Sequence, residues 1–235
     1  MTRKALIIGA AYKDPKIPGV YTDLVVWNDF LQSDLGGAWT SEEIQVLPDP
    51  SGAEVHSALK TLGQADYGFL VFCGHGATIT RDKPWPETEL DFGKHGQLTD
   101  SEINPGNRRC TLVLDCCRGY LDAEEDRQFL VEGKSASFSV RKNVREIFDK
   151  SLEAAEMGLV TIFAAREGQG ASDSKSFSKQ LIHQARITME RHPGVLDQAL
   201  AVELTAEAMK KTTPQQQPEY IGGRRRNHFP FAVDA

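Results

Sequence analysis

Short apolar runs alternate with amphipathic stretches along most of this chain. Each run is continuous and is followed by glycine, proline or polar residues, a pattern that is typical of strands buried on both faces of a sheet. The runs that we interpret as strands are residues 4–10, 43–47, 67–73, 111–115, 159–165 and 229–233.

Between these runs, apolar positions recur at helical spacing and predict helices. Leu24, Trp27 and Leu31 lie on one stripe of the first helix, so Trp27 is expected in the core. Ser51 and Glu54 form a capping-box pattern that starts the second helix. The predicted helices are residues 22–35, 51–62, 175–191 and 194–211.

Strands that alternate with helices predict an α/β fold, in which right-handed crossovers build a mostly parallel sheet covered on both faces. We find no internal repeat, low-complexity tract or linker that would divide the chain. Its 235 residues fit the usual size of one large domain or two small ones. We therefore expect a single domain over residues 1–235.

Two long segments interrupt this alternation, at residues 76–96 and 118–141, and both are predicted to be irregular. Each begins just after the carboxyl end of an apolar strand. In open α/β sheets ligands bind outside these strand ends, and loops of this length in a compact domain are usually functional or disordered. The sequence therefore predicts the site where the two segments begin.

Composition excludes several classes of protein. The chain has 40% apolar and 26% charged residues, which excludes a disordered or fibrous protein. Its net charge of -6 argues against nucleic acid as the main partner, and we interpret the one dense basic run, at 224–226, as a solvated turn. The sequence has neither a long apolar run nor a targeting pattern, so we expect no membrane span. Its four cysteines are grouped mid-chain, unlike a disulfide framework, and we therefore expect the protein to act in the reducing cytoplasm.

A histidine and a cysteine follow the two strands at the predicted site. His75 stands between two glycines after the strand 67–73, and Cys117 follows the strand 111–115. An imidazole that takes the proton of a thiol makes the sulfur a nucleophile. We expect the backbone amides of Gly76 and Cys117 to hold the oxyanion of a tetrahedral intermediate.

Two adjacent cysteines compete for the role of nucleophile. Side chains alternate along a strand, so Asp115 and Cys117 share one side, and Cys116 points to the other side with Leu114. Cys116 is then most simply a small buried core residue. We therefore assign the nucleophile to Cys117.

These residues resemble those of caspase-like cysteine peptidases. Cys117-Arg118-Gly119, with a histidine some tens of residues upstream, is similar to the caspase signature. The Asp115-x-Cys117 pattern looks more like the metacaspase and bacterial caspase-like branch. Further similar stretches are Leu6-Ile7-Ile8-Gly9, Gly74-His75-Gly76, Val20-Tyr21-Thr22-Asp23, Phe30-Leu31 and residues 218–231.

The resemblance implies a three-layer caspase-like sandwich with a central, mostly parallel six-stranded sheet. It implies that His75 is the general base and acid, that Cys117 is the nucleophile and that Gly76 donates to the oxyanion. True caspases have glutamine where this chain has Asp115. An acid at that position would repel an acidic side chain and pair with Arg or Lys.

We therefore expect cleavage of protein substrates after Arg or Lys. Asp115 is the main substrate-binding residue in this interpretation, Asp23 matches an acidic position of the family, and Asp173 is a further candidate. The segment 118–145 corresponds to the intersubunit linker of caspases and is rich in basic residues, which implies self-processing there.

The resemblance also implies a biological setting. Bacterial proteins of this kind look like executioners in defence or cell-death systems, with a gasdermin-like pore former as the substrate and a separate sensor or adaptor protein. We expect no cofactor. The family also raises calcium activation. The sequence shows no EF-hand loop, but calcium binding to acidic surface loops stays open.

Several simpler interpretations remain open. His75 could be structural, or Cys73, His75, Cys116 and Cys117 could ligate zinc, although their spacing argues against convergence. Asp23 could stabilise a helix N-terminus, and Asp115 could be held by a local backbone bond. The whole chain could also be a caspase-fold interaction module without peptidase activity.

Overall fold

A central sheet organises the computed structural model, which describes residues 1–11, 17–80, 85–119, 143–172 and 176–234. Its main path runs in the order β2-β1-β3-β6-β7-β9. The strands of the described chain are β1 (Arg3–Ala10), β2 (Ile44–Pro48), β3 (Tyr67–Ile79), β4 (Glu87–Asp91), β5 (Gln97–Thr99), β6 (Arg109–Asp115), β7 (Gly158–Phe163), β8 (Gly194–Asp197), β9 (Glu219–Ile221) and β10 (Pro230–Asp234).

The predicted mostly parallel sheet of six strands is confirmed. Neighbours along the path from β2 to β7 pair in parallel, and β9 pairs antiparallel with β7 at the edge. Parallel strands carry their carboxyl ends at one edge of the sheet, so the ends of β3 and β6 lie side by side there.

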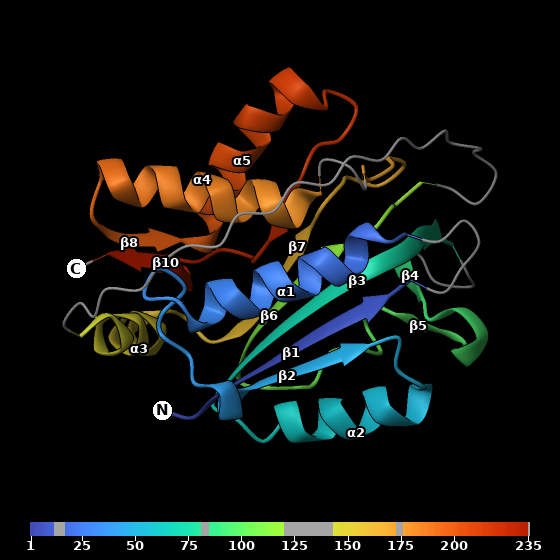
Figure 1. The fold of residues 1–235 in the computed structure, drawn as a ribbon, viewed down its shortest axis with the longest axis horizontal. Coiled ribbons are helices and arrows are strands. Elements are labelled where there is room, and N and C mark those ends of the chain that lie inside the picture. The colour runs from blue at the N-terminus through green and yellow to red at the C-terminus, as the bar shows by residue number, and fades with distance from the viewer. Residues whose placement is uncertain (12–16, 81–84, 120–142, 173–175, 235) are drawn as a thin grey trace.

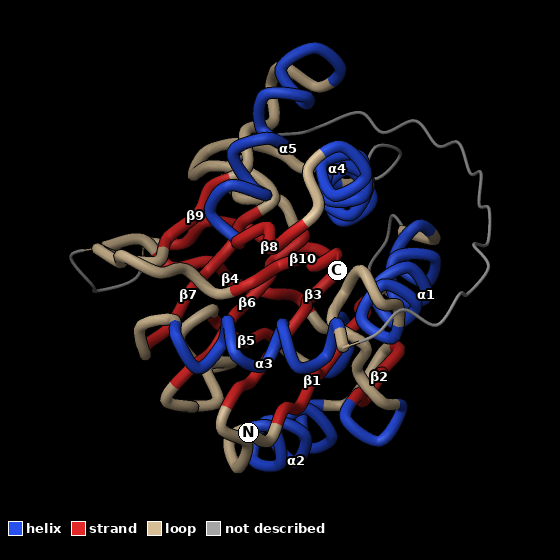
Figure 2. Tube along the Cα trace, turned by 90° about the vertical axis from the view of Figure 1, so that its left-hand side faces the viewer, coloured by secondary structure: helices blue, strands red, loops and turns tan. Residues whose placement is uncertain are grey.

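Helices cover both faces of the sheet and make three layers (Figure 1). α1 and α4 lie next to each other over the same face, as the view in Figure 2 also shows, and α2 covers the opposite face. The helices of the described residues are α1 (Gly19–Gln32), α2 (Gly52–Leu62), α3 (Val144–Ala154), α4 (Phe177–Arg191) and α5 (Gln198–Thr212).

Side chains of the strands alternate between two apolar cores, one on each face. Along β3, Val71 and Cys73 face the core under α1 and α4, whereas Leu70 and Phe72 face the core under α2. Trp27 is fully buried in the first core, as its helical stripe predicts. The alternation decides which residues at the strand ends reach the α1–α4 side.

Two predictions of local structure were wrong in part. Residues 76–96 are not wholly irregular, because β3 continues to Ile79 and pairs antiparallel with β4. The predicted helix 194–211 begins instead as β8, which pairs with β10 in a separate two-stranded sheet. The helix starts only after Asp197, whose side chain accepts a hydrogen bond from the Leu200 amide.

A search of the described helices for membrane spans found none that is both long and apolar enough to cross a bilayer.

Candidate active site

The carboxyl ends of β3 and β6 bring the predicted histidine and cysteine onto neighbouring chain segments. The parallel pairing of the two strands ends at Cys73 opposite Asp115. His75 and Cys117 each follow two residues later, and β3 carries His75 onward into its pairing with β4. Both residues therefore lie at the edge of the parallel strands where the sequence predicted the site.

The two segments touch just beyond this point. A Cβ placed on Gly76 would lie 2.7 Å from the Cys116 sulfur and 3.0 Å from the Cys117 carbonyl oxygen. Both distances are too short for a side chain, so this close approach requires glycine. Further along β3, the Thr78 amide donates to the Gly119 carbonyl at 3.0 Å, which keeps the segments together.

Arg118 anchors the segment that follows the sheet. Its guanidinium is buried, lies 3.8 Å from the centre of the Phe163 ring and pairs with the Glu219 carboxylate at 2.8 Å. It also donates to the Thr88 hydroxyl at 3.1 Å. These contacts fix the backbone immediately after Cys117, a role that the sequence motif did not indicate.

Cys117 differs from the other three cysteines in its surroundings. It is half-buried, and its sulfur accepts a hydrogen bond from the Ala171 amide at 3.3 Å and lies 3.7 Å from the Ala171 carbonyl oxygen. Cys73, Cys110 and Cys116 are buried, and burial raises the pKa of each thiol, that of Cys110 to about 12. Burial therefore suits these three to a structural role.

The expected burial of Cys116 is confirmed. Its side chain belongs to the core under α2, with Leu112 and Leu114. Cys117 and Asp115 reach the opposite side, where both line one small cavity. The other residues at this cavity are Ile17, Val20, Asp23, Cys73, Gly74, Cys116, Ala171, Ser172 and Ser176.

Asp115 is buried on the α1–α4 side and is held from the start of α4. One of its oxygens accepts hydrogen bonds from the Ser178 amide at 2.9 Å and the Ser178 hydroxyl at 2.6 Å. The Trp27 indole donates to the same hydroxyl at 2.7 Å and orients it. The alternative of a local backbone bond for Asp115 is wrong, because this partner lies 63 positions away.

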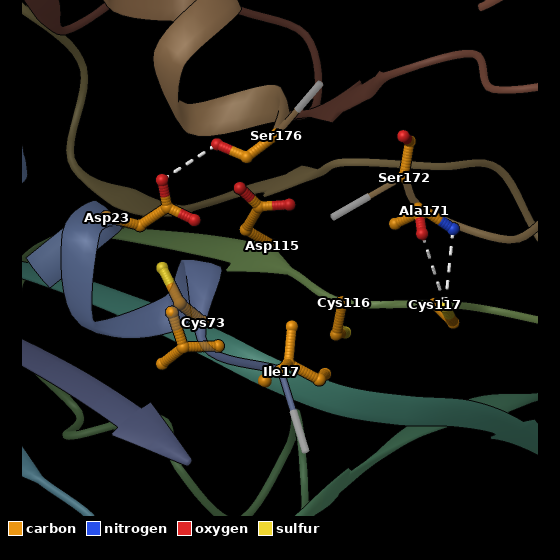
Figure 3. Close-up of a pocket in the computed structure, with 11 residues that line it drawn as sticks. Ile17, Asp23, Cys73, Asp115, Cys116, Cys117, Ala171, Ser172 and Ser176 are labelled. Carbon is orange, nitrogen blue, oxygen red and sulfur yellow. Dashed lines mark hydrogen bonds between the residues drawn. The ribbon is translucent and has the colours of Figure 1, made fainter. Parts of the chain in front are cut away.

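Asp23 lies beside Asp115 and is also bound from α4, as Figure 3 shows. It accepts a hydrogen bond from the Ser176 hydroxyl at 2.9 Å and pairs with the Lys179 ammonium at 3.2 Å. α1 begins at Gly19, so Asp23 lies past the first turn and the helix-terminus interpretation is wrong.

Burial perturbs both acids, and the charge of Asp23 adds to its effect on Asp115. Burial, followed by the Asp23 charge, raises the pKa of Asp115 to about 7. Burial also raises the pKa of Asp23, while Lys179 and the Ser176 hydroxyl act against that rise. Two carboxyl groups with raised pKa values beside a half-buried thiol are the combination expected of a functional site.

Other predicted features are not brought together here. Asp173 and most of the proposed linker, residues 120–142, lie outside the described residues. Among the described residues, the ligand atoms of Asp23, Cys73 and Asp115 lie close enough together to hold a metal ion. This cluster differs from the zinc ligands considered from the sequence, with which it shares only Cys73. Sequence reasoning missed Ser176, Ser178 and Lys179, whose only signal was a serine-rich start to the α4 pattern.

Comparisons with known proteins agree with this architecture. A family model described as the caspase domain matches residues 2–222. The crystal structure of caspase-1 from Spodoptera frugiperda is similar, with a TM-score of 0.56 and 13% sequence identity. That similarity covers 95% of this chain and 88% of the insect chain, and at this identity it concerns the fold alone. A search among curated proteins found no match.

Proposed function

The chain belongs to the caspase-domain family of cysteine peptidases, and on that premise we propose that it is a cysteine endopeptidase with a His75–Cys117 dyad. One observation carries the proposal: the same cavity is lined by the half-buried thiol and by two buried carboxyl groups. A nucleophile and a binding site for a basic side chain would then be adjacent, as cleavage of a peptide bond after that side chain requires.

In the proposed reaction, His75 takes the thiol proton of Cys117, and the sulfur attacks the carbonyl carbon of the substrate. The amides of Gly76 and Cys117 hold the developing oxyanion. His75 then gives the proton to the leaving amine as the C–N bond breaks, and water hydrolyses the thioester that remains. The Ala171 amide, which donates to the sulfur at 3.3 Å, would help to hold it in place.

The proposed specificity is for Arg or Lys at P1, the substrate residue whose carbonyl is attacked. Asp115 is the principal acid in this proposal, because it lines the same cavity as Cys117. A cationic partner would favour its ionised form over the protonated form that burial favours. Asp23 contributes to the same pocket, and Asp173 remains a proposed third acid.

Fluorogenic peptides with Arg, Lys, Asp or citrulline at P1 test this function. We expect turnover with Arg and Lys, little with Asp or with citrulline (a neutral analogue of Arg), and none in the Cys117→Ala or His75→Ala variants. Cys110→Ala is the matched control and should remain active. A folded protein that cuts none of the peptides, with or without calcium, would support the interaction-module alternative.

The remaining expectations are proposals that rest on the same activity. They are self-processing within 118–145, action in the cytoplasm without a cofactor, and a protein substrate such as a gasdermin-like pore former in a bacterial defence or cell-death system. Intact-mass measurements of wild type and Cys117→Ala test self-processing, since only the active protein should be shortened. Proteomic comparison of the same two proteins tests the substrate.

A further inference from the structure

Lys179 reaches the acid pocket from the first turn of α4. Its ammonium nitrogen lies 3.2 Å from an Asp23 oxygen, and its side chain is 33% exposed where that of Asp23 is 4% exposed. The ion pair thus joins a buried acid to a cation at the protein surface. A basic substrate side chain entering the pocket would meet an acid that already has a partner.

The start of α4 holds this lysine in place. The Ser176 hydroxyl accepts a hydrogen bond from the Lys179 amide at 3.3 Å and donates to Asp23 at 2.9 Å. Two residues after Ser176, Ser178 donates twice to Asp115. The first turn of α4 therefore gives Asp23 a cationic partner, Lys179, and gives Asp115 only neutral hydrogen-bond donors.

The charges around the pocket do not balance. Asp23 and Asp115 are two acids, and among the described residues the cation beside them is Lys179, which pairs with Asp23. Cys73 also faces them, but burial and both acids raise the pKa of its thiol and keep it neutral. When both acids are ionised, one negative charge remains among the described groups. Asp115 is the acid outside the Lys179–Asp23 ion pair, although the Lys179 charge also acts on it.

We propose that Lys179 is a specificity-determining residue: it occupies Asp23 as an internal counter-ion and leaves Asp115 as the single acid available to a basic P1 side chain. The inference rests on the proposed function, because it assigns the roles of the two acids within the P1 pocket. It predicts that neutralising Asp115 removes the preference for a positive charge, and that removing Lys179 then restores it through Asp23.

The test measures binding without turnover, in a Cys117→Ala background at pH 8.5. Two labelled peptides differ only at P1, with Arg in one and its neutral isostere citrulline in the other, and fluorescence anisotropy gives the ratio of their Kd values. We expect wild-type pocket residues to favour Arg about tenfold or more, and Asp115→Asn to bring the ratio close to one.

Adding Lys179→Met to Asp115→Asn should restore a preference for Arg of about fivefold, because Asp23 loses its internal partner. Lys179→Gln should act in the same way and provides a second neutral variant should the methionine disturb folding. Asp115→Asn with Lys179→Arg keeps the cation and should stay near one. Asp115→Asn with Lys210→Met removes an exposed lysine on α5 instead and should also stay near one.

Suppose that the Kd ratio of the two peptides stays near one when Asp115→Asn is combined with either Lys179→Met or Lys179→Gln, and that circular dichroism shows both variants folded. That result would overturn the role of Lys179. Equal recovery with Lys210→Met would also overturn it, since net charge alone would then explain the effect. No preference for Arg in the wild-type pocket would refute the proposed P1 specificity itself. The two failures are therefore distinguishable.

Discussion

Two buried clusters of charged residues lie at opposite ends of the sheet, and they differ in how their charges are balanced. At the amino end of β1, the Arg3 cluster consists of Arg3, Glu43, Arg145 and Asp149, so two cations face two acids. At the carboxyl end, the acid pocket has Asp23 and Asp115, and among the described residues Lys179 is the cation beside them.

The Arg3 cluster has the properties of a structural tie. The Arg3 guanidinium is 1% exposed, lies 3.2 Å from Asp149 and 3.6 Å from Glu43, and stacks 4.5 Å from the centre of the Trp39 ring. It also donates to the Gly37 carbonyl at 3.1 Å. These contacts join β1 to α3, which are far apart in sequence, and the two cations balance the two acids among the described residues.

The acid pocket has the opposite property, because within the described part of the chain Asp115 has no ion pair and lies beside a cavity. Burying an unpaired carboxyl group costs free energy, which appears as the raised pKa of Asp115. A purely structural role does not require a buried carboxyl group that lacks an ion pair, whereas the recognition of a cationic ligand does. The comparison teaches that imbalance of buried charge, more than burial of charge, marks the candidate site.

The largest effect that we predict is on the structural side of this comparison. Arg3→Met should lower the free energy of unfolding by about 3–5 kcal/mol, because it leaves Asp149 and Glu43 without their buried cation. Unfolding in urea measures the loss. The preference of the folded fraction for Arg over citrulline should stay unchanged, and a changed preference would mean that the two clusters are coupled.

The second prediction concerns Asp115. Asp115→Asn should lower kcat/KM for Arg peptides about 100-fold, equivalent to about 2.7 kcal/mol, because the amide cannot pair with a cation. Steady-state kinetics with Arg and citrulline peptides measures it. Asp66→Asn, an exposed acid at the other end of the sheet, is the matched control, and an equal loss there would refute a specific role for Asp115.

Part of this site could be predicted from the sequence, because the rules that place it are local. Apolar runs indicated β3 and β6, and alternation along β6 put Asp115 and Cys117 on one side and Cys116 on the other. The edge of a parallel sheet then brought the ends of β3 and β6 together. Each step needs only neighbouring residues and one general property of parallel sheets.

The partners of the acids could not be predicted, since they depend on how α1 and α4 pack. Ser178 meets Asp115 across 63 positions and Ser176 meets Asp23 across 153, and no pattern in the sequence links them. The extension of β3 beyond Cys73 was missed for a related reason. Its pairing with β4 is a tertiary contact, and the glycines around His75 read as a loop.

The third prediction is a pH dependence of about tenfold. With a pKa of about 7 in the free protein, Asp115 is mostly protonated at pH 6 and mostly ionised at pH 8. The ratio of kcat/KM for Arg over citrulline peptides should therefore rise about tenfold between these values. A ratio that does not change with pH would contradict Asp115 as the P1 acid.

Stability should follow the opposite course over the same range. The folded-state pKa of Asp115 lies above the unfolded value of 3.8, so the folded state binds more protons between these two values. The stabilisation that protonated Asp115 contributes is therefore complete below pH 3.8 and is lost as the pH rises through about 7. Unfolding titrations at several pH values, compared with Asp115→Asn, measure this contribution.

The smallest effect that we predict lies at the rim of the Arg3 cluster. Arg145 pairs with Glu43 at 2.5 Å, but its side chain is 39% exposed. Arg145→Met should therefore cost less than about 1 kcal/mol of unfolding free energy, and 1 M salt should reduce the difference, because exposed ion pairs are weak and screened. Guanidinium contributes salt of its own, so urea unfolding is the suitable measurement. A loss as large as that of Arg3→Met would show that the four residues of the Arg3 cluster stabilise the fold as one unit. The contrast with the acid pocket would then concern the whole cluster and not Arg3 alone.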